Sequence, residues 1–167
     1  LLALEVGIAT GRLHAREADD LSLALTHLPE AAAEFLQEED LNVSQIANEL
    51  KDQDAMLFVG GGPNWFSARE GALKVEEQSC LFSKAYRPAE FLHGAIPLIS
   101  ETVGTVIIGA AGRSYDRSHD AVRTSIAAGA PCLALVVDGD DRIASTANFV
   151  VAVPDPHDEL MMPALAT

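Results

Sequence analysis

The fold is decided by residues 55–64, which read AMLFVGGGPN. The stretch opens with a short, continuous apolar run, which is typical of a strand buried on both faces of a sheet. Three glycines then form a turn, and residues 64–78 have the pattern of a helix. A strand that passes through a tight turn into a helix begins a βαβ unit, so the sequence predicts a parallel sheet with helical crossovers.

Four further strands are predicted downstream of this unit. They cover residues 80–86, 102–109, 131–137 and 149–153. A helix over residues 114–128 ends at Gly129, whereas residues 138–148 are poor in helix signals. We therefore expect an α/β fold, a three-layer αβα sandwich with a five-stranded, mainly parallel sheet of the flavodoxin type. Its ligand site is expected at the carboxyl ends of the strands.

Residues 1–50 are predicted to be all helical and to form an arm ahead of the sheet domain of residues 51–167. Helices are expected over residues 1–12 and 42–52, with apolar stretches at 21–25 and 31–37 between them. Pro29 is expected to open the second of these stretches, because proline is tolerated in the first turn of a helix. The first helix has no cap signal, so we expect the chain to be a piece of a longer polypeptide that also continues beyond residue 167.

The charge balance narrows the classes of partner. The chain has 11 Lys and Arg against 25 Asp and Glu, a net charge of −14. Nucleic acids and anionic membranes both require clustered cations, so neither is an expected partner. No apolar run approaches the roughly 18 residues of a membrane span, and no signal peptide is apparent. Cys80 and Cys132 have neither a disulfide framework nor a metal spacing. We expect a cytoplasmic protein without a metal or cofactor.

The glycine turn at residues 60–62 has two interpretations. It lets backbone N–H groups approach an anion at the start of the following helix, or it is simply a tight turn that needs positive φ. The turn matches neither the dinucleotide nor the Walker pattern, which disfavours a nucleotide. Ser114, Asp116 and Ser118 lie near the start of another helix, where contact with a phosphate and helix capping explain them equally well.

Glu70, Lys74 and Glu77 are spaced i, i+4 and i+7, so they share one face of the helix at residues 64–78. Carboxylates beside an ammonium group are suited to relaying a proton next to a bound sugar. The alternative is an ordinary solvated Glu–Lys pair, which is common on helix surfaces.

His93 is predicted to lie in a loop flanked by prolines at positions 88 and 97. The ordinary pKa of histidine suits acid–base exchange near neutral pH, although a plain surface histidine is the alternative. The other four histidines are scattered and have no metal-ligand spacing.

Taken together, these motifs resemble those of a known family. The motifs are FVGGGP at residues 58–63, EGALKVEE at 70–77, AY at 85–86 and EFLHG at 90–94. They are similar to the sugar isomerase (SIS) domain family, and within it to the second SIS domain of the glutamine–fructose-6-phosphate aminotransferases. The resemblance covers nearly the whole chain and implies the SIS, flavodoxin-like fold.

The resemblance also implies roles for individual residues. Glu77 resembles the carboxylate that moves a proton between C1 and C2 of the sugar phosphate, and Lys74 resembles its companion. His93 resembles a histidine that assists ring opening across a subunit boundary. The substrate-binding residues that we expect are Gly61, Gly62, Asn64 and Glu70.

The predicted function is that of a phosphosugar-binding SIS domain of an isomerase and aminotransferase, converting fructose-6-phosphate to glucosamine-6-phosphate. The alternatives are a sugar-phosphate deaminase or ketose–aldose isomerase, and a non-catalytic phosphosugar-binding regulatory module. Leu92 and Ala95 stand where the family commonly has Lys and Pro, and no glutaminase or first SIS domain is recognisable. We therefore expect the chain to be incomplete as an enzyme and to form a homo-oligomer or pack on another SIS domain.

Overall fold

Five strands form one sheet in the order β2-β1-β3-β4-β5. They are β1 (Ala55–Gly60), β2 (Phe82–Tyr86), β3 (Val103–Gly109), β4 (Cys132–Val137) and β5 (Phe149–Val153). Every pair of neighbouring strands is parallel, and this order is that of a doubly wound, flavodoxin-like sheet. The computed structural model describes residues 2–155 and residue 163. The predicted fold class and all five strands are confirmed.

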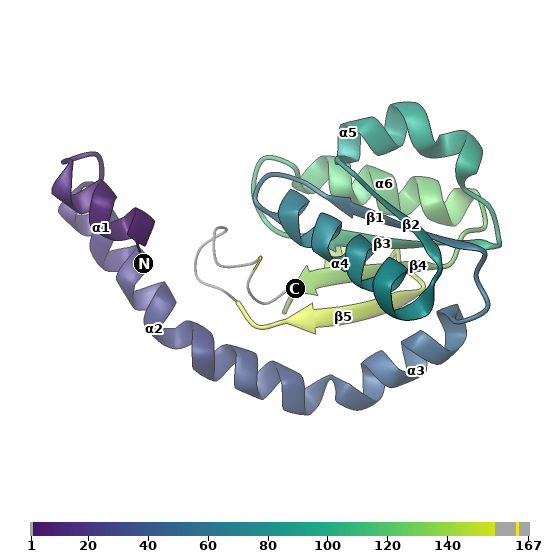
Figure 1. The fold of residues 1–167 in the computed structure, drawn as a ribbon, viewed down its shortest axis with the longest axis horizontal. Coiled ribbons are helices and arrows are strands. Elements are labelled where there is room, and N and C mark those ends of the chain that lie inside the picture. Colours follow the sequence, from purple (N-terminus) through teal and green to yellow (C-terminus); the bar gives the residue numbers. More distant parts are fainter. Residues whose placement is uncertain (1, 156–162, 164–167) are drawn as a thin grey trace.

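Helices cover both faces of the sheet (Figure 1). One face carries α4 (Asn64–Ser79) together with the end of the arm, and the other carries α5 (Pro88–Glu90), α6 (Tyr115–Ala127) and α7 (Asp141–Ala144). Successive residues of β1 serve the two layers in turn, because strand side chains alternate. Phe58 packs toward α4, whereas Leu57 and Val59 pack toward the α6 layer. The domain therefore has three layers, with the sheet in the centre and a layer of helices on each face.

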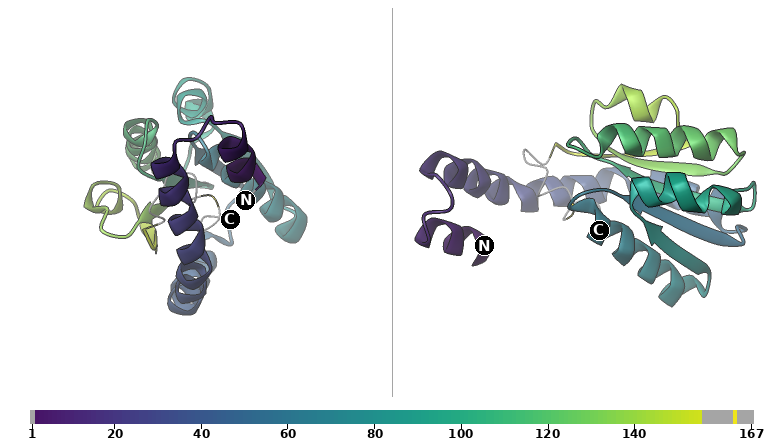
Figure 2. Two further views of the ribbon diagram at one scale, coloured as in Figure 1. Left: turned by 90° about the vertical axis from the view of Figure 1, so that its left-hand side faces the viewer. Right: turned by 90° about the horizontal axis from the view of Figure 1, so that it is seen from above.

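The helical arm comprises α1 (Leu2–Ala9), α2 (Ala15–Glu38) and α3 (Asp40–Leu50). It extends well beyond the sheet domain (Figure 2). The arm is attached to the sheet domain through α3 and the second half of α2, and Ile46 and Leu50 of α3 are buried there. In the part of the chain that the structure describes, no helix is both long and apolar enough to cross a membrane.

The prediction that Pro29 opens a helix was wrong, because Pro29 lies inside the continuous α2. Proline removes one i→i−4 hydrogen bond from a helix interior. Here Leu28 and Phe35 pack against the same apolar cluster on the sheet. We attribute the persistence of the helix to this tertiary anchoring, which local sequence rules do not include.

The predicted loop around His93 is also wrong, since the chain there is helical. After α5 it continues as a π-helical turn, η1 (Phe91–Ala95), and a 3₁₀ turn, η2 (Ile96–Leu98). The segment begins with a capping box, in which the backbone N–H of Arg87 donates to Glu90 at 3.0 Å. The fully buried Phe91 then anchors the turn against the sheet. Similarly, residues 138–148 contain the single-turn helix α7, which Asp140 caps by accepting from the N–H of Ile143 at 2.9 Å.

The burial of β1 leads to a stability prediction. Leu57 is 1% exposed in the α6-side core, so Leu57→Ala leaves a cavity and should lower the free energy of unfolding by about 2–5 kcal/mol. Leu41→Ala is the matched control, because Leu41 is 76% exposed and should cost less than about 0.5 kcal/mol. Urea denaturation measures both, and equal losses would contradict this packing.

Candidate functional site

A hollow of about 200 Å³ lies at the carboxyl ends of β1 and β3. The strand order reverses between these two strands, so the connections after them diverge and leave a crevice. The lining residues are Gly61, Gly62, Pro63, Asn64, Ala111, Arg113 and Ser114. A Cβ atom on Gly61 would lie 2.3 Å from the Ser114 hydroxyl oxygen, and Gly62 has φ of +56°. Gly61 is therefore required for the close approach to Ser114, and Gly62 is required for the positive φ of the turn.

The polar groups of this hollow are largely unused by the protein. Asn64 is 4% exposed, and its Oδ1 atom has no hydrogen-bond partner among the described residues. Ser114 precedes α6, yet its side chain caps no backbone N–H. By contrast, Ser118 donates to the carbonyl of Ile108 at 3.3 Å, and Asp116 accepts from Arg142 at 2.7 Å. Of the three residues that the sequence left open between capping and phosphate contact, only Ser114 lines the hollow.

Glu70, Lys74 and Glu77 lie together on an exposed face of α4, as their spacing predicted. The Lys74 ammonium is 2.9 Å from Glu77 Oε2 and 3.4 Å from Glu70 Oε1. The hydrogen bond to Glu77 is the largest of the effects that raise the pKa of Lys74 above its ordinary 10.5. Their side chains are between 42% and 55% exposed, so the cluster is open to solvent on this chain alone.

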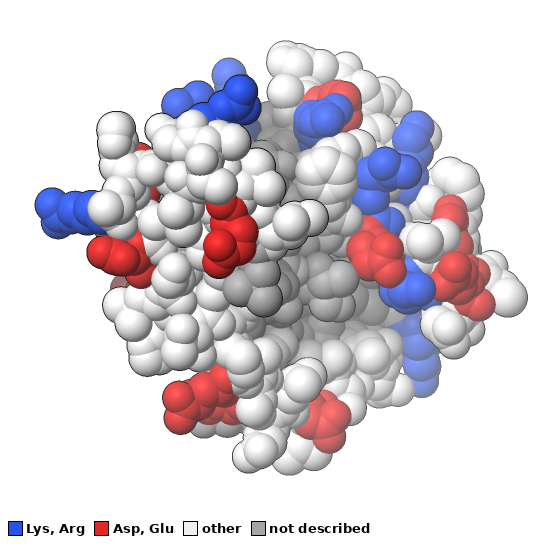
Figure 3. All heavy atoms as spheres, turned by 60° about the vertical axis from the view of Figure 1, so that its left-hand side comes forward, with Lys and Arg blue, Asp and Glu red and all other residues white. Residues whose placement is uncertain are grey.

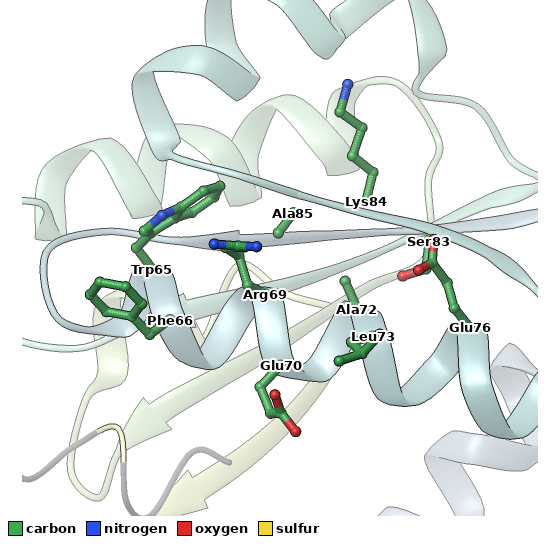
Figure 4. A pocket seen from close by; sticks show the side chains of 10 residues that line it. All are labelled: Trp65, Phe66, Arg69, Glu70, Ala72, Leu73, Glu76, Ser83, Lys84 and Ala85. Atoms are coloured by element: carbon green, nitrogen blue, oxygen red, sulfur yellow. The ribbon is translucent and has the colours of Figure 1, made fainter.

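A groove runs between α4 and the edge strand β2, and Glu70 of the Lys74 cluster is one of the residues that line it (Figure 4). Trp65, Arg69 and Glu76 line it from the helix, and Ser83 and Lys84 line it from the strand. Successive helix residues are about 100° apart, which is why Glu76 belongs to this groove and its neighbour Glu77 does not. Local sequence patterns do not reveal this groove, because the pairing of α4 with β2 is a tertiary contact.

The structure does not bring all of the predicted site residues together. Glu77 follows Asn64 by 13 positions in α4, which is roughly 20 Å along the axis. An extended hexose phosphate at about 1.5 Å per bond spans only about 10 Å. The backbone positions of Asn64 and Glu77 are therefore farther apart along α4 than one sugar phosphate is long.

His93 is separate from both groups. It lies in η1, which packs on the opposite face of the sheet from α4. Its side chain is exposed and makes no hydrogen bond or ion pair with a described residue. Among residues 2–155, no group of three or more His, Cys, Asp or Glu side chains is arranged to hold a metal ion.

Solved structures with the same architecture define the class of this domain. The C-terminal domain of glucosamine-fructose-6-phosphate aminotransferase from Francisella tularensis matches with a TM-score of 0.83 at 20% identity, over 99% of this chain and 48% of that chain. The NanR protein of Vibrio vulnificus, complexed with ManNAc-6P, matches with a TM-score of 0.70 at 9% identity, over 98% of this chain and 60% of that one. The fold is that of a sugar isomerase (SIS) domain.

Sequence similarity narrows the relationship further. The glutamine–fructose-6-phosphate aminotransferase of Thermus thermophilus is 32% identical over 157 residues, which is 94% of this chain and 26% of that protein. No protein-family model matches the chain. The chain is a homologue of the glutamine–fructose-6-phosphate aminotransferases over nearly all of its length, and it spans about a quarter of the length of these relatives.

The ion cluster on α4 leads to a prediction about the titration of Lys74. Because the folded state favours the ammonium form of Lys74, this contribution to stability is complete below about pH 10.5 and is lost as the pH rises through the raised pKa. Glu77→Gln should remove more of the upward pKa shift than Glu70→Gln, since the Glu77 contact is the larger cause. NMR titration of the Lys74 side chain measures both, and a larger effect of Glu70→Gln would contradict this geometry.

Proposed function

We propose that this chain is the phosphosugar-binding SIS domain of an isomerase and aminotransferase that converts fructose-6-phosphate to glucosamine-6-phosphate. The observation that carries the proposal is the exposed Glu70–Lys74–Glu77 cluster on a chain that is homologous to these enzymes over nearly its whole length. The transcription factor of Sphaerobacter thermophilus, whose sugar isomerase domain has a similar structure, is 13% identical and shares the fold alone. The sequence similarity therefore favours the enzyme over a regulatory module.

In this proposal, Glu77 moves a proton between C1 and C2 of the sugar phosphate. A base that acts beside a carbonyl carbon must come within about 2.6–3.2 Å of the proton it takes. Lys74 donates to Oε2 of Glu77 and so orients that carboxylate, leaving its other oxygen available to the substrate. Glu70, whose Oε1 atom is 3.4 Å from the Lys74 ammonium, is proposed to contact a sugar hydroxyl.

The site also requires surfaces from outside this chain. The cluster is about half exposed, and proton abstraction is favoured where bulk water is excluded. We propose that another SIS domain or a second copy covers α4 and that His93 of another copy assists ring opening. We also propose that residues 1–50 form an arm and that residues 51–167 form an SIS domain. The enzyme is proposed to be cytoplasmic. Gly61, Gly62 and Asn64 are proposed to contact a phosphate group.

The role of Glu77 is tested by Glu77→Gln in the whole protein, with any segments that flank these residues. Glutamine keeps the helix, because it is also a good helix former, but it cannot accept a proton as a base. Exchange of the sugar C1 and C2 hydrogens with solvent should fall by about 10²–10⁴-fold, while the affinity for the sugar phosphate stays nearly constant.

Glu76→Gln is the control for this experiment. Glu76 lines the groove against β2 and not the Lys74 face, so its removal should leave hydrogen exchange nearly unchanged. Equal, mild effects of the two substitutions would mean that the Glu70–Lys74–Glu77 face is ordinary surface.

The arm leads to a prediction about assembly. Leu2, Val6, Ile8 and Leu23 on α1 and α2 are between 48% and 79% exposed, an apolar surface that is typical of an interface. Sedimentation should show an oligomer at tens of micromolar protein, which is roughly the range of dissociation constants of moderately stable interfaces. Leu23→Glu should shift the equilibrium to monomer, whereas Leu98→Glu, 53% exposed in η2, should not. A strict monomer of the unmodified protein would contradict the proposal.

A further inference from the structure

We propose that a second copy of this chain docks on the outer face of α4, with the two α4 helices antiparallel about a two-fold axis at Leu73. The inference rests on the proposed function, in which α4 is covered in the whole protein. It deepens that function by naming the partner as an identical chain and by naming the residues in contact. A two-fold contact uses the same surface on both copies, so this surface must be complementary to itself.

The outer face of α4 has an apolar stripe. Phe66 and Leu73 are 69% and 43% exposed, and because they are seven positions apart they lie within about 20° of each other around the helix. Phe82, at the start of the neighbouring strand β2, is 63% exposed. Exposed apolar side chains that gather on one face are typical of an interface.

Arg69 and Glu76 make this face complementary to itself in charge. They precede and follow Leu73 by four and three positions, and Figure 4 shows both on the side of α4 that faces β2. Both are exposed, and neither forms an ion pair with a described residue. When two α4 helices run antiparallel with Leu73 at the axis, Arg69 of each copy lies opposite Glu76 of the partner subunit. Two ion pairs therefore form across the contact.

The same charges exclude a parallel arrangement of the two helices. In that arrangement each Arg69 would face another Arg69 and each Glu76 another Glu76, and like charges that face one another across an interface are unfavourable. The signs of these two side chains therefore select the antiparallel orientation.

The net charge of −14 on each copy opposes association at long range. Figure 3 shows Lys and Arg side chains interspersed with Asp and Glu side chains on one side of the molecule, and no continuous field of one sign. Screening over about 8 Å removes most of the long-range repulsion at physiological ionic strength. The close contacts between Arg69 and Glu76 then determine how the two copies meet.

The pairing also covers the cluster on which the proposed function depends. Around the helix, Glu77 lies about 40° from Leu73 in one direction and Arg69 about 40° in the other. A partner helix whose axis is about 8–10 Å away excludes part of the bulk water from Glu70, Lys74 and Glu77, which are between 42% and 55% exposed in one copy. The same partner contacts the arm, so the arm and α4 both contribute to one dimer.

Disulfide cross-linking of the whole protein under a mild oxidant tests the contact at the axis. Leu73→Cys should form a covalent dimer, because the two positions meet there and a disulfide requires Cα atoms about 4.4–6.8 Å apart. The native Cys80 is exposed, but the two copies of Cys80 are separated by about 21 Å along the paired helices. The unmodified protein should therefore remain unlinked, and Cys132 is buried.

A second cysteine variant tests the antiparallel register. Phe66 and Cys80 are seven positions before and after Leu73, so Phe66 of one copy lies opposite Cys80 of the partner subunit. Phe66→Cys should therefore form a covalent dimer through the native Cys80. Adding Cys80→Ser should abolish this link.

Exchange of the two charges tests the ion pairs. Arg69→Glu and Glu76→Arg should each weaken self-association by about tenfold or more in sedimentation, because each places like charges opposite one another in both contacts. An equimolar mixture of the two variants should associate again, since each copy then carries the charge that its partner lacks. Arg123→Glu is the control, because Arg123 is exposed on α6, on the opposite face of the sheet, and its exchange should have little effect.

Glu76→Gln, the control for hydrogen exchange, remains valid in this arrangement. The glutamine carbonyl oxygen still accepts a hydrogen bond from Arg69. The variant therefore stays paired at protein concentrations well above its dissociation constant.

The proposal is overturned if Leu73→Cys forms no covalent dimer, or if the mixture associates no better than either charge variant alone. It is also overturned if Arg123→Glu weakens association as much as Arg69→Glu. Cross-linking and mixing do not depend on the reaction. A dimer with these properties in which Glu77→Gln leaves hydrogen exchange unchanged would contradict the catalytic role alone, so the two failures are distinguishable.

Discussion

The close packing of α4 on β1 is the constraint on which the rest of the structure depends. A Cβ atom on Gly71 would lie 2.8 Å from the Phe58 ring, and Ala68 and Ala72 are almost fully buried beside it. Small residues on the sheet side of α4 let the helix approach the strand closely. The position of the helix along β1 is thereby set, and the two ends of α4 are placed at opposite ends of the sheet.

The two ends of α4 offer different chemistry. The amino-terminal end meets the connection after β3, where Gly61, Asn64 and Arg113 line a small hollow. Farther along the helix, Lys74 is held between two carboxylates on a face that points to solvent. The side chains of this cluster are between 42% and 55% exposed. We therefore regard α4 as the element that positions both the hollow and the Lys74 cluster.

The sequence predicted the sheet well, because β1, β3, β4 and β5 are mostly apolar runs bounded by turn residues. The exception is β2, an edge strand that reads FSKAY and is largely exposed. The sequence also predicted that Glu70, Lys74 and Glu77 share a face, since helical spacing alone determines that. It failed at Pro29 and around His93, where long-range burial keeps a helix that local rules would end or omit. The unpartnered amide of Asn64 and the contact between Gly61 and Ser114 depend on segments about 50 residues apart, so no local pattern reveals them.

A crystal structure of the whole protein with a hexose 6-phosphate bound at the reaction site tests the proposed role of Glu77. We predict that C1 and C2 of the sugar lie beside α4, with a Glu77 carboxylate oxygen within hydrogen-bond reach, about 2.6–3.2 Å, of the transferring atoms. A sugar whose C1 and C2 lie instead against Gly61 and Ser114, far from Glu77, would contradict it.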